Sequence, residues 1–583
     1  MSDHDGKHGG DLVAEFLAAR GVRHLFTLCG GHISPILTGA KRLGIRVVDA
    51  RGEATAVFAA DAVSRLSGRP GVAAVTAGPG VTNSVTALKN AQMAPSSLVL
   101  LGGATATLLR GRGALQDIDQ VALVRSLVKW RGRARRLADI VPLLDRAFTE
   151  ASAGVPGPVF LELPVDLLYP EALVRQLYGL SSEKKPRGLA GWVERALIER
   201  HVRRLFAEER ARAGIAAHRT KAPEVRADRN AVGRAAALLK RAQRPVLLVG
   251  GQATLRTEAL GALAAAIGRL GIPTYLSGMA RGLLGREQSL QMRHRRKEAL
   301  READFVLLAG VPCDFRLEYG RHIGREASVV AVNVRPEEVR KNRKPRVGVA
   351  GDPARFLIAL AEERRGPDRG PWLETLRKRD GDRDRQIEEM AGQPAPPVHP
   401  LRLCRAIESA AAEDATFVAD GGDFVATASY VVRPRRPLSW LDPGVFGTLG
   451  GGAGFAIGAK ACRPDSEVWI LYGDGSAGYS LQEFDTFVRH GLPVIAVVAN
   501  DASWMQIARD QVAMLGDAVG TDLRRTDYHV VAEGWGGRGL LLDDERRIDA
   551  VLAEAKSIAR VGSPVLINAH LGATEFRKGS ISL

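Results

Sequence analysis

Short apolar runs recur along the chain and alternate with longer stretches that carry helical periodicity. In the first part the runs are near-continuous, without the polar alternation of a half-exposed strand, which indicates strands buried on both faces. Strands that alternate with Ala-rich helices are typical of a parallel, doubly wound α/β sheet. The runs lie at residues 25–28, 72–76, 98–101 and 159–163.

The same pattern occurs twice more, first at residues 245–251, 305–310 and 328–333 and then at 468–472 and 494–499. Linker-like segments separate the three regions. The sequence therefore predicts an α/β fold with three doubly wound parallel-sheet domains. The predicted divisions are an N-terminal domain at 9–183, a basic linker with an amphipathic helix at 184–229, a central Rossmann-like domain at 230–365, a linker at 366–398, and a C-terminal domain at 399–583.

Two acidic residues follow predicted strands of the last domain. Asp474 lies in Gly473-Asp474-Gly475-Ser476 after the run 468–472, and Asp501 follows the run 494–499. Between them there is room for one helix, roughly 481–490, and a return strand, so the carboxylates can meet at neighbouring strand ends. Two such carboxylates suit Mg²⁺, and the glycines allow a diphosphate to approach the backbone. An ordinary Gly-Asp-Gly turn is the alternative.

A second group of residues lies in the first domain. Glu53 follows the strand-like residues 45–49 and opens an Ala-rich helix, and the run 72–76 leads into Gly78-Pro79-Gly80 and Asn83. A glutamate in a buried helix is unusual, because an unpaired buried carboxylate is costly. The alternative is a carboxylate placed at the helix start by the macrodipole.

Together these segments resemble the thiamine-diphosphate enzyme family over essentially the whole chain. The resemblance implies pyrimidine-binding, central Rossmann-like and diphosphate-binding domains, with thiamine diphosphate and Mg²⁺ as cofactors. By this likeness Glu53 is the activating acid, and Asp474, Asp501 and the Ser503 carbonyl are the metal ligands. The cofactor-binding residues that the resemblance implies are Glu53, Gly78, Pro79, Gly80, Asn83, Gly422, Asp423, Phe424, Thr448, Leu449, Gly473, Asp474, Gly475, Ser476 and Asp501.

Two of these segments differ in residue type from the family's commoner sequence. In Gly447-Thr448-Leu449-Gly450 the family's apolar wedge, which props the cofactor into a bent shape, falls on Leu449. In the loop 420–424 the pair Asp423-Phe424 replaces the family's commoner Gln-His or Ala-Asn pair. The resemblance therefore does not establish side-chain phosphate contacts from that loop.

Stretches at residues 25–35, 113–120, 278–285, 313–317 and 526–529 resemble one branch, the acetolactate synthase-like proteins that act as 2-hydroxyacyl-CoA lyases. This likeness implies cleavage of a 2-hydroxyacyl-CoA to formyl-CoA and an aldehyde. Acetolactate synthase, or another 2-oxoacid decarboxylase or carboligase, is the alternative and shares the same acids. The acidic tract 116–119 is ill suited to two pyruvate carboxylates, because like charges repel. A chain that binds without catalysing would have no need of Glu53.

The branch likeness also suggests further substrate-site residues. Gln116 aligns with the family's active-site glutamine, with a surface amide as the alternative, and His32 could line the site or cap a helix. Arg281, Arg316 and Arg321 are candidates for the phosphates of CoA by residue type. Gly250-Gly251 lacks GxGxxG, so the sequence leaves ADP, CoA or FAD open for the central domain.

Composition excludes several other classes of protein. The 583 residues are 45% hydrophobic and 25% charged, as in a large globular enzyme. The net charge of +17 comes mostly from arginines spread along the chain without interleaved aromatics, which argues against nucleic acid. Four scattered cysteines predict buried thiols. No apolar run approaches the roughly 20 residues of a membrane span, and the start lacks a signal-peptide core, so we expect a cytoplasmic protein.

The basic linker contains a predicted helix at residues 192–206. Its apolar positions 198, 202, 205 and 206 share one face, which could lie on a membrane, cover a long acyl chain or pack between domains. Because Glu53 and Asp474 lie in different domains, and the family builds its site across a two-fold axis, the resemblance also implies a homodimer or a dimer of dimers.

Overall fold

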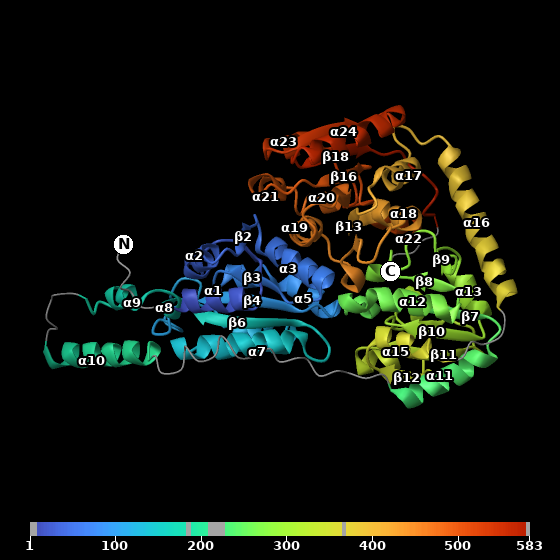
Figure 1. The fold of residues 1–583 in the computed structure, drawn as a ribbon. Helices are drawn as coiled ribbons and strands as arrows, with labels where there is room; N and C mark the ends of the chain where they lie inside the picture. Colours follow the sequence, from blue (N-terminus) through green and yellow to red (C-terminus); the bar gives the residue numbers. More distant parts are fainter. Residues whose placement is uncertain (1–7, 182–187, 208–227, 364–368, 579–583) are drawn as a thin grey trace. The chain divides into compact units, whose positions relative to one another are not determined.

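The computed structural model describes residues 8–181, 188–207, 228–363 and 369–578. The chain forms two compact units, one made of Met1–Ser64 and Arg69–Pro223 and the other of Arg65–Gly68 and Glu224–Leu583. Each of the three sheets has six parallel strands (Figure 1). The predicted α/β fold with three parallel-sheet domains is confirmed.

The first sheet has the order β2-β1-β3-β4-β6-β5. Alternate strand residues, such as Leu25, Val72 and Val99, form a core with three helices, α1 (Gly9–Ala19), α2 (Ser34–Arg42) and α7 (Ile140–Ser152). Side chains of a strand alternate between its two faces, so this core covers one face only. The strands are β1 (His24–Thr27), β2 (Arg46–Asp49), β3 (Gly71–Val75), β4 (Leu98–Ala104), β5 (Trp130–Arg133) and β6 (Pro158–Pro164).

The second unit holds the other two sheets. The central sheet has the order β12-β11-β10-β7-β8-β9, and the C-terminal sheet has the order β14-β13-β15-β16-β18-β17. The central strands are β7 (Pro245–Val249), β8 (Thr274–Leu276), β9 (Gln291–Met292), β10 (Phe305–Ala309), β11 (Ser328–Asn333) and β12 (Val347–Ala350). The C-terminal strands are β13 (Thr416–Asp420), β14 (Trp440–Leu441), β15 (Val468–Gly473), β16 (Ile495–Asn500), β17 (Arg538–Leu542) and β18 (Val565–His570).

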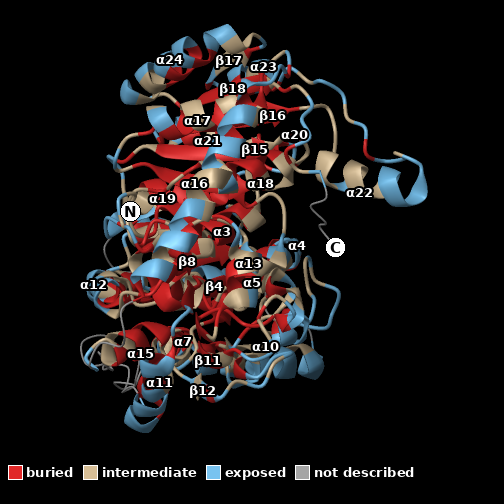
Figure 2. Cartoon of the chain, turned by 90° about the vertical axis from the view of Figure 1, so that its right-hand side faces the viewer, coloured by how far each residue is buried: buried red, intermediate tan, exposed pale blue. Residues whose placement is uncertain are grey.

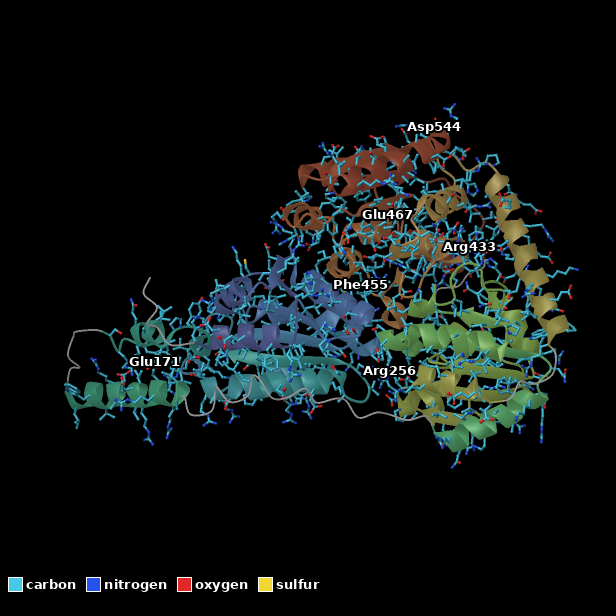
Figure 3. The ribbon with its side chains drawn as sticks, viewed as in Figure 1. Glu171, Arg256, Arg433, Phe455, Glu467 and Asp544 are labelled. Carbon is cyan, nitrogen blue, oxygen red and sulfur yellow. The ribbon has the colours of Figure 1, made fainter. Side chains whose placement is uncertain are left out.

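Buried strands with exposed outer helix surfaces recur throughout the chain (Figure 2). In the C-terminal sheet a charged side chain helps to hold the central strand. Glu467, which directly precedes β15, accepts hydrogen bonds from the Ala412 backbone (2.9 Å) and the Trp469 indole (3.1 Å). Glu467, which is labelled in Figure 3, also pairs with Lys556 of α24 (Ile548–Arg560) at 3.2 Å. The start of the strand that leads to Asp474 is thus tied to α24 and to the chain at Ala412.

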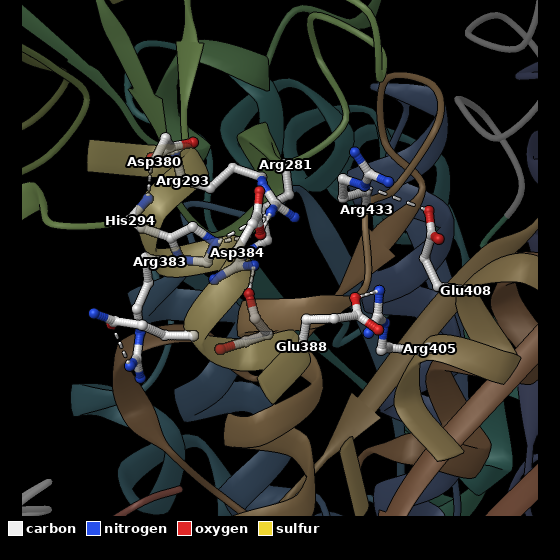
Figure 4. A network of polar contacts seen from close by, with 12 residues as sticks. Arg281, Arg293, His294, Asp380, Arg383, Asp384, Glu388, Arg405, Glu408 and Arg433 are labelled. Carbon is white, nitrogen blue, oxygen red and sulfur yellow. Dashed lines mark hydrogen bonds and ion pairs between the residues drawn. The ribbon is translucent and has the colours of Figure 1, made fainter. Parts of the chain in front are cut away.

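The segment predicted as a linker at 366–398 contains a long helix, α16 (Gly370–Gly392). The helix is held to the central domain by its own acidic residues (Figure 4). Asp380 accepts hydrogen bonds from the backbone of Arg293 (3.0 Å) and His294 (2.7 Å), and Asp384 lies 3.0 Å from the His294 ring. The run of Asp and Arg that suggested a linker is therefore a docked helical face.

The predicted amphipathic helix is α10 (Gly188–Leu205). Its Val202 and Leu205, with the following Phe206, are buried in the core of the first unit, where Val174 of α9 (Glu171–Leu177) also lies. That face packs within the first unit, so the two alternatives of a membrane surface and an acyl chain do not apply to it. The basic residues 184–187 and 208–227 of the same segment lie outside the described residues.

The four cysteines, all within the described residues, form no disulfide, but the prediction that all four are buried is wrong. Cys313 and Cys404 are buried, Cys462 is half-buried, and Cys29 is exposed in the loop that follows β1. Among the described residues, no helix combines the length and apolar character needed to cross a bilayer.

Candidate active site

The carboxyl ends of three adjacent strands, β13, β15 and β16, form the centre of the C-terminal site. Their parallel register places Asp420 beside Tyr472 and Gly473 beside Ala499. Asp474 begins the short helix α20 (Asp474–Ala477), and Asp501 follows β16 directly. The predicted helix between them is α21 (Glu483–Arg489). The structure brings the two acidic segments together at one edge of the sheet.

Asp474 and Asp501 share a backbone donor, the N–H of Ser503. This group lies 3.2 Å from Asp474 Oδ2 and 3.2 Å from Asp501 Oδ1. Burial raises the pKa of Asp474. Burial, followed by the charges of Asp474 and Asp423, raises the pKa of Asp501 to about 7. Two carboxylates held this close repel each other, and a divalent cation between them would offset the repulsion.

No cluster of three or more His, Cys, Asp or Glu side chains suited to a metal occurs in the described part of the chain. The aspartate pair therefore fits an ion that takes its remaining oxygen ligands from the backbone and from a bound phosphate. Mg²⁺ behaves in this way, because it demands oxygen ligands and is often shared with substrate phosphates.

A cavity of about 640 Å³ surrounds this edge of the sheet. Backbone at Gly421 (φ 69°) and Gly422 (φ 85°) adopts the left-handed conformation that favours glycine. A side chain at Gly421 would also overlap Leu449 Cδ2 and approach Ser476. The backbone of these two glycines, free of side chains, forms a cradle that a diphosphate could enter. The predicted residues that line the cavity are Gly422, Asp423, Phe424, Thr448, Leu449, Gly473, Asp474, Gly475, Ser476, Asp501 and Ser503.

Asp423 departs from the family pattern, and the structure shows its partners. Its carboxylate forms an ion pair with Arg509 of α22 (Met505–Leu515) and lies 3.7 Å from Arg577. A carboxylate engaged with two arginines does not present a donor to a phosphate. Phe424 packs into the hydrophobic core of the domain and borders the cavity.

Sequence reasoning assigned no role to Asp420, which is 1% exposed. Its carboxylate accepts hydrogen bonds from the backbone N–H groups of Gly450 (3.1 Å) and Gly452 (2.7 Å). Burial raises its pKa to about 7. Asp420 thus fastens the segment that carries Leu449 to the glycine loop. The signal available in the sequence was an aspartate at a strand end, directly before two glycines.

Glu53 is the first residue of α3 (Glu53–Ser67) in the first unit, and its side chain is buried. The Asn83 amide donates a hydrogen bond to Glu53 Oε2 at 3.1 Å. Glu53 thus lies at a helix start and also has a specific hydrogen-bond partner. Its position near the positive end of the helix dipole is therefore compatible with a functional role. Asn83 directly follows α4 (Pro79–Thr82), so the turn at Gly78 and the helix of Glu53 are joined through this contact.

A buried glutamine that sequence reasoning missed holds the Gly78 turn. Gln120 accepts from the Gly78 N–H at 3.2 Å and donates to the Gly103 carbonyl at 2.7 Å. Gly78 has a φ of 62°, and a side chain there would crowd the backbone of Gln116. The signal was present, because Gln120 ends the stretch 113–120 that carries the branch likeness.

Gln116 and His32 lie in different surroundings. Gln116 adopts a φ of 60° in a loop and borders a separate hollow of about 350 Å³, together with Arg110 and His201. His32 Nδ1 lies 3.2 Å from the Thr76 hydroxyl, and burial lowers the pKa of His32. The helix-capping alternative for His32 is wrong, since α2 has Ile33 at its N-cap and no side-chain cap.

The three arginines suggested for CoA do not all line the same cavity. Arg281 and Arg316 border the 640 Å³ cavity. Arg281 donates to the Ser429 carbonyl (2.7 Å), and Arg316 pairs with Asp314 (2.7 Å). Arg321 lies in a different hollow of the central domain.

Three family models match successive regions of the chain. Family models match the "Thiamine pyrophosphate enzyme, N-terminal TPP binding domain" at residues 7–123, the "central domain" at 232–360 and the "C-terminal TPP binding domain" at 420–569. Thiamine pyrophosphate is another name for thiamine diphosphate. The matched N- and C-terminal regions contain the Glu53 and Asp474 segments respectively.

Several curated proteins align along nearly the whole chain. The chain is 49% identical to "2-hydroxyacyl-CoA lyase 2" of Danio rerio over 589 residues, covering 99% of this chain and 94% of the relative. It is equally similar to the Homo sapiens protein of that name, at 49% over 99% and 92% of the two chains. A "Probable acetolactate synthase" of Mycobacterium bovis is 35% identical over 96% and 95%.

Proposed function

The chain belongs to the thiamine pyrophosphate enzyme family, and we propose that it is a carbon–carbon lyase that acts on 2-hydroxyacyl-CoA. The C1–C2 bond of the substrate breaks, the 2-hydroxyl carbon becomes an aldehyde, and the former thioester carbon gains a proton and leaves as formyl-CoA. The observation that carries this proposal is the 49% identity over 99% of the chain to proteins named 2-hydroxyacyl-CoA lyase 2. In the reverse direction the same site would join formyl-CoA to an aldehyde.

The C-terminal site would hold the charged end of the cofactor. Asp474, Asp501 and the Ser503 carbonyl would bind Mg²⁺, and the backbone around Gly421 and Gly473 would accept the diphosphate. The support is the buried aspartate pair, whose repulsion a cation would offset, and the glycine cradle that excludes side chains.

When bound, thiamine diphosphate supplies an electron sink for the charge that develops as the C1–C2 bond breaks. Glu53 would exchange a proton with the pyrimidine ring, held in place by the Asn83 hydrogen bond at Oε2. Leu449 would contact the bound cofactor, and the hydrogen bond from the Gly450 N–H to Asp420 restrains the segment that carries Leu449. The hydrogen bond that holds Glu53 and the one that restrains the Leu449 segment both limit the motion of groups near the cofactor, which is a proximity effect.

A base must accept the 2-hydroxyl proton of the substrate. His32 is the candidate: its Nδ1 lies 3.2 Å from the Thr76 hydroxyl, and burial lowers its pKa, which favours the neutral ring that can accept a proton. Gln116 would donate a hydrogen bond to the reacting oxygen. We further propose a homodimer, or a dimer of dimers, because family members build their site across a two-fold axis.

Product analysis of the loaded enzyme tests the activity. We expect formyl-CoA and an aldehyde one carbon shorter than the acyl chain, with kcat/KM at least about tenfold above that for acetolactate formation from pyruvate. Acetolactate production without formyl-CoA would overturn the proposal in favour of the acetolactate synthase alternative.

A further inference from the structure

The loop that carries Gln116 is not held by burial of its own side chains. It runs from the end of β4 at Ala104 to the start of α6 (Gln120–Leu123) and contains no helix or strand. The structure describes all of residues 106–119, and every one of them is exposed or half-buried. Gln116 has a φ of 60°, a left-handed backbone conformation that is unfavourable for any residue with a Cβ. Such a conformation persists only where surrounding contacts enforce it, so the position of Gln116 depends on the polar contacts of this loop.

A buried carboxylate anchors the loop near its beginning. Asp166, on the short helix α8 (Val165–Leu168) that follows β6, is 4% exposed. Its Oδ2 accepts hydrogen bonds from the Thr107 backbone N–H at 2.9 Å and from the Thr107 hydroxyl at 2.5 Å. The Tyr178 hydroxyl donates to the same oxygen at 2.8 Å, and burial, followed by the charge of Asp166, raises the pKa of Tyr178. The contacts are charge-assisted hydrogen bonds, which are about twice as strong as neutral ones.

A histidine of α10 contacts the same threonine (Figure 1 labels α8 and α10). His201 Nε2 lies 2.8 Å from the Thr107 hydroxyl oxygen. The single hydrogen of that hydroxyl is donated to Asp166, so the ring nitrogen donates and the threonine oxygen accepts. Burial lowers the pKa of His201, which favours the neutral ring. Thr107 is therefore held from two sides, by α8 and by α10.

Two ion pairs also reach this loop from the rest of the domain, but they are weaker. Arg110 lies 3.9 Å from Glu162, and Asp119 lies 3.6 Å from Arg133. Both distances exceed those of a hydrogen bond, and the Arg110 and Asp119 side chains are 37% and 64% exposed. Ion pairs with such exposed groups contribute little to stability. The buried contact with Asp166 is therefore the stronger restraint on the loop.

The anchored beginning of the loop is joined to the segment of Gln116. The Thr105 hydroxyl donates to the carbonyl of Leu115, the residue before Gln116, at 3.2 Å. Thr107 and Gln116 also border the same hollow of about 350 Å³. We propose that Asp166 is a positioning residue of the lyase reaction, which holds Thr107 so that the Gln116 amide meets the reacting oxygen. This role rests on the proposed function, because Gln116 acts on that oxygen only if the chain catalyses the reaction.

A double-mutant cycle on the enzyme loaded with thiamine diphosphate and Mg²⁺ tests whether Asp166 acts through Gln116. Asp166→Asn keeps the size of the side chain and removes its charge, so kcat for formyl-CoA production should fall at least about tenfold with KM within about twofold. Gln116→Ala should also lower kcat. In the Gln116→Ala background, Asp166→Asn should lower kcat by less than about twofold more, because the positioned contact is already absent. Effects that multiply would overturn the inference.

Thr107 offers a matched pair of variants for the same contact. Thr107→Val keeps the shape of the side chain and loses the hydroxyl, so kcat should fall about threefold to tenfold, the effect of one or two lost hydrogen bonds. Thr107→Ser restores the hydroxyl and should recover kcat to within about twofold of the parent. Equal losses in the two variants would assign Thr107 to packing and contradict the inference.

Amide hydrogen exchange measures the anchor without using activity. In the presence of thiamine diphosphate and Mg²⁺, amides of residues 106–118 should exchange at least about tenfold faster in Asp166→Asn than in the parent, because the loop opens more readily. Unchanged exchange would overturn the anchor. Faster exchange, in a protein whose parent makes no formyl-CoA, would reject the lyase function and retain Asp166 as the anchor of the loop.

Asp61→Asn is the control for a general loss of stability. Asp61 is fully buried in the same domain and accepts a hydrogen bond from the Asn90 amide at 3.1 Å. This variant should lower the Tm while kcat and the exchange of residues 106–118 stay as in the parent. If Asp61→Asn lowers kcat as much as Asp166→Asn does, the effect at Asp166 is one of stability and the inference is wrong.

Discussion

The N-terminal and C-terminal sheets have the same topology but use it for different chemistry. Numbered within each domain, both sheets run in the order 2-1-3-4-6-5. In the first domain the acid Glu53 follows the second strand, and in the last domain Asp474 and Asp501 follow the third and fourth. The shared topology provides a set of strand ends, and the residues placed there decide what each set can bind.

The electrostatic surroundings of these acids also differ. Glu53 has a neutral hydrogen-bond partner, Asn83, and lies in the first turn of a helix. Asp474 and Asp501 share one backbone donor, and no cationic side chain of the described residues forms an ion pair with either. The first arrangement suits exchange of a proton with a bound group, and the second suits a cation. The comparison therefore predicts that variants of the two sites will fail in different ways.

The largest effect is expected at Glu53. Glu53→Gln should slow turnover by a factor on the order of 10² or more while thiamine diphosphate binds within several-fold, because acid–base assistance is lost and binding groups remain. Hydrogen–deuterium exchange at the thiazolium C2 is the direct measurement. Glu171→Gln, at the first residue of the exposed helix α9, controls for the loss of a helix-start charge. Unchanged exchange in Glu53→Gln would remove this residue from the proton path.

Asp474→Asn should show the opposite behaviour, a failure of binding. We expect the affinities for Mg²⁺ and for thiamine diphosphate to fall together by about tenfold or more, since the cation bridges protein and phosphates. Calorimetric titration of each ligand gives the two affinities, with the exposed Asp465→Asn as the matched control. Loss of one affinity without the other would contradict a shared cation.

A smaller effect is expected at Asn83. Asn83→Ala removes the hydrogen bond to Glu53 Oε2 and leaves the acid in place, so turnover should fall about fivefold, the value of one ordinary hydrogen bond. The pH profile of kcat separates this role from a general loss of structure, because only a change at Glu53 would displace the profile. An undisplaced profile would assign Asn83 to packing.

The smallest effect is expected for Asp501, on the free energy of unfolding of the metal-free protein. The folded pKa of Asp501 is raised to about 7, so its carboxylate favours the folded state less as the pH rises from about 4 through 7. Asp501→Asn removes this charge and should stabilise the metal-free protein at pH 8 by about 1 kcal/mol, with little gain at pH 4. Thermal unfolding at both pH values measures it. Added Mg²⁺ should raise the Tm of the parent at pH 8 but not that of the variant.

Much of the site could be read from local sequence signals. Strand ends followed by Gly and Asp located the residues around Asp474, and an acid at a helix start located Glu53. The partners of these residues could not be read in this way. Asn83, Gln120 and Asp420 make hydrogen bonds to residues at least 17 positions away, and nothing in the local pattern indicates which distant donor a side chain meets.

The amino-acid sequence by itself determined the three parallel sheets, since buried strands and helices leave different hydrophobic periods along the chain. It also determined which acids directly follow a strand, because the strands themselves are recognisable from their apolar runs. Only the tertiary structure decided what covers each surface. It buried the apolar face of α10 and docked α16 through Asp380 and Asp384. Amphipathic and charged patterns in the sequence predict whether a surface is apolar or charged. Long-range packing decides whether protein, solvent or a ligand covers that surface.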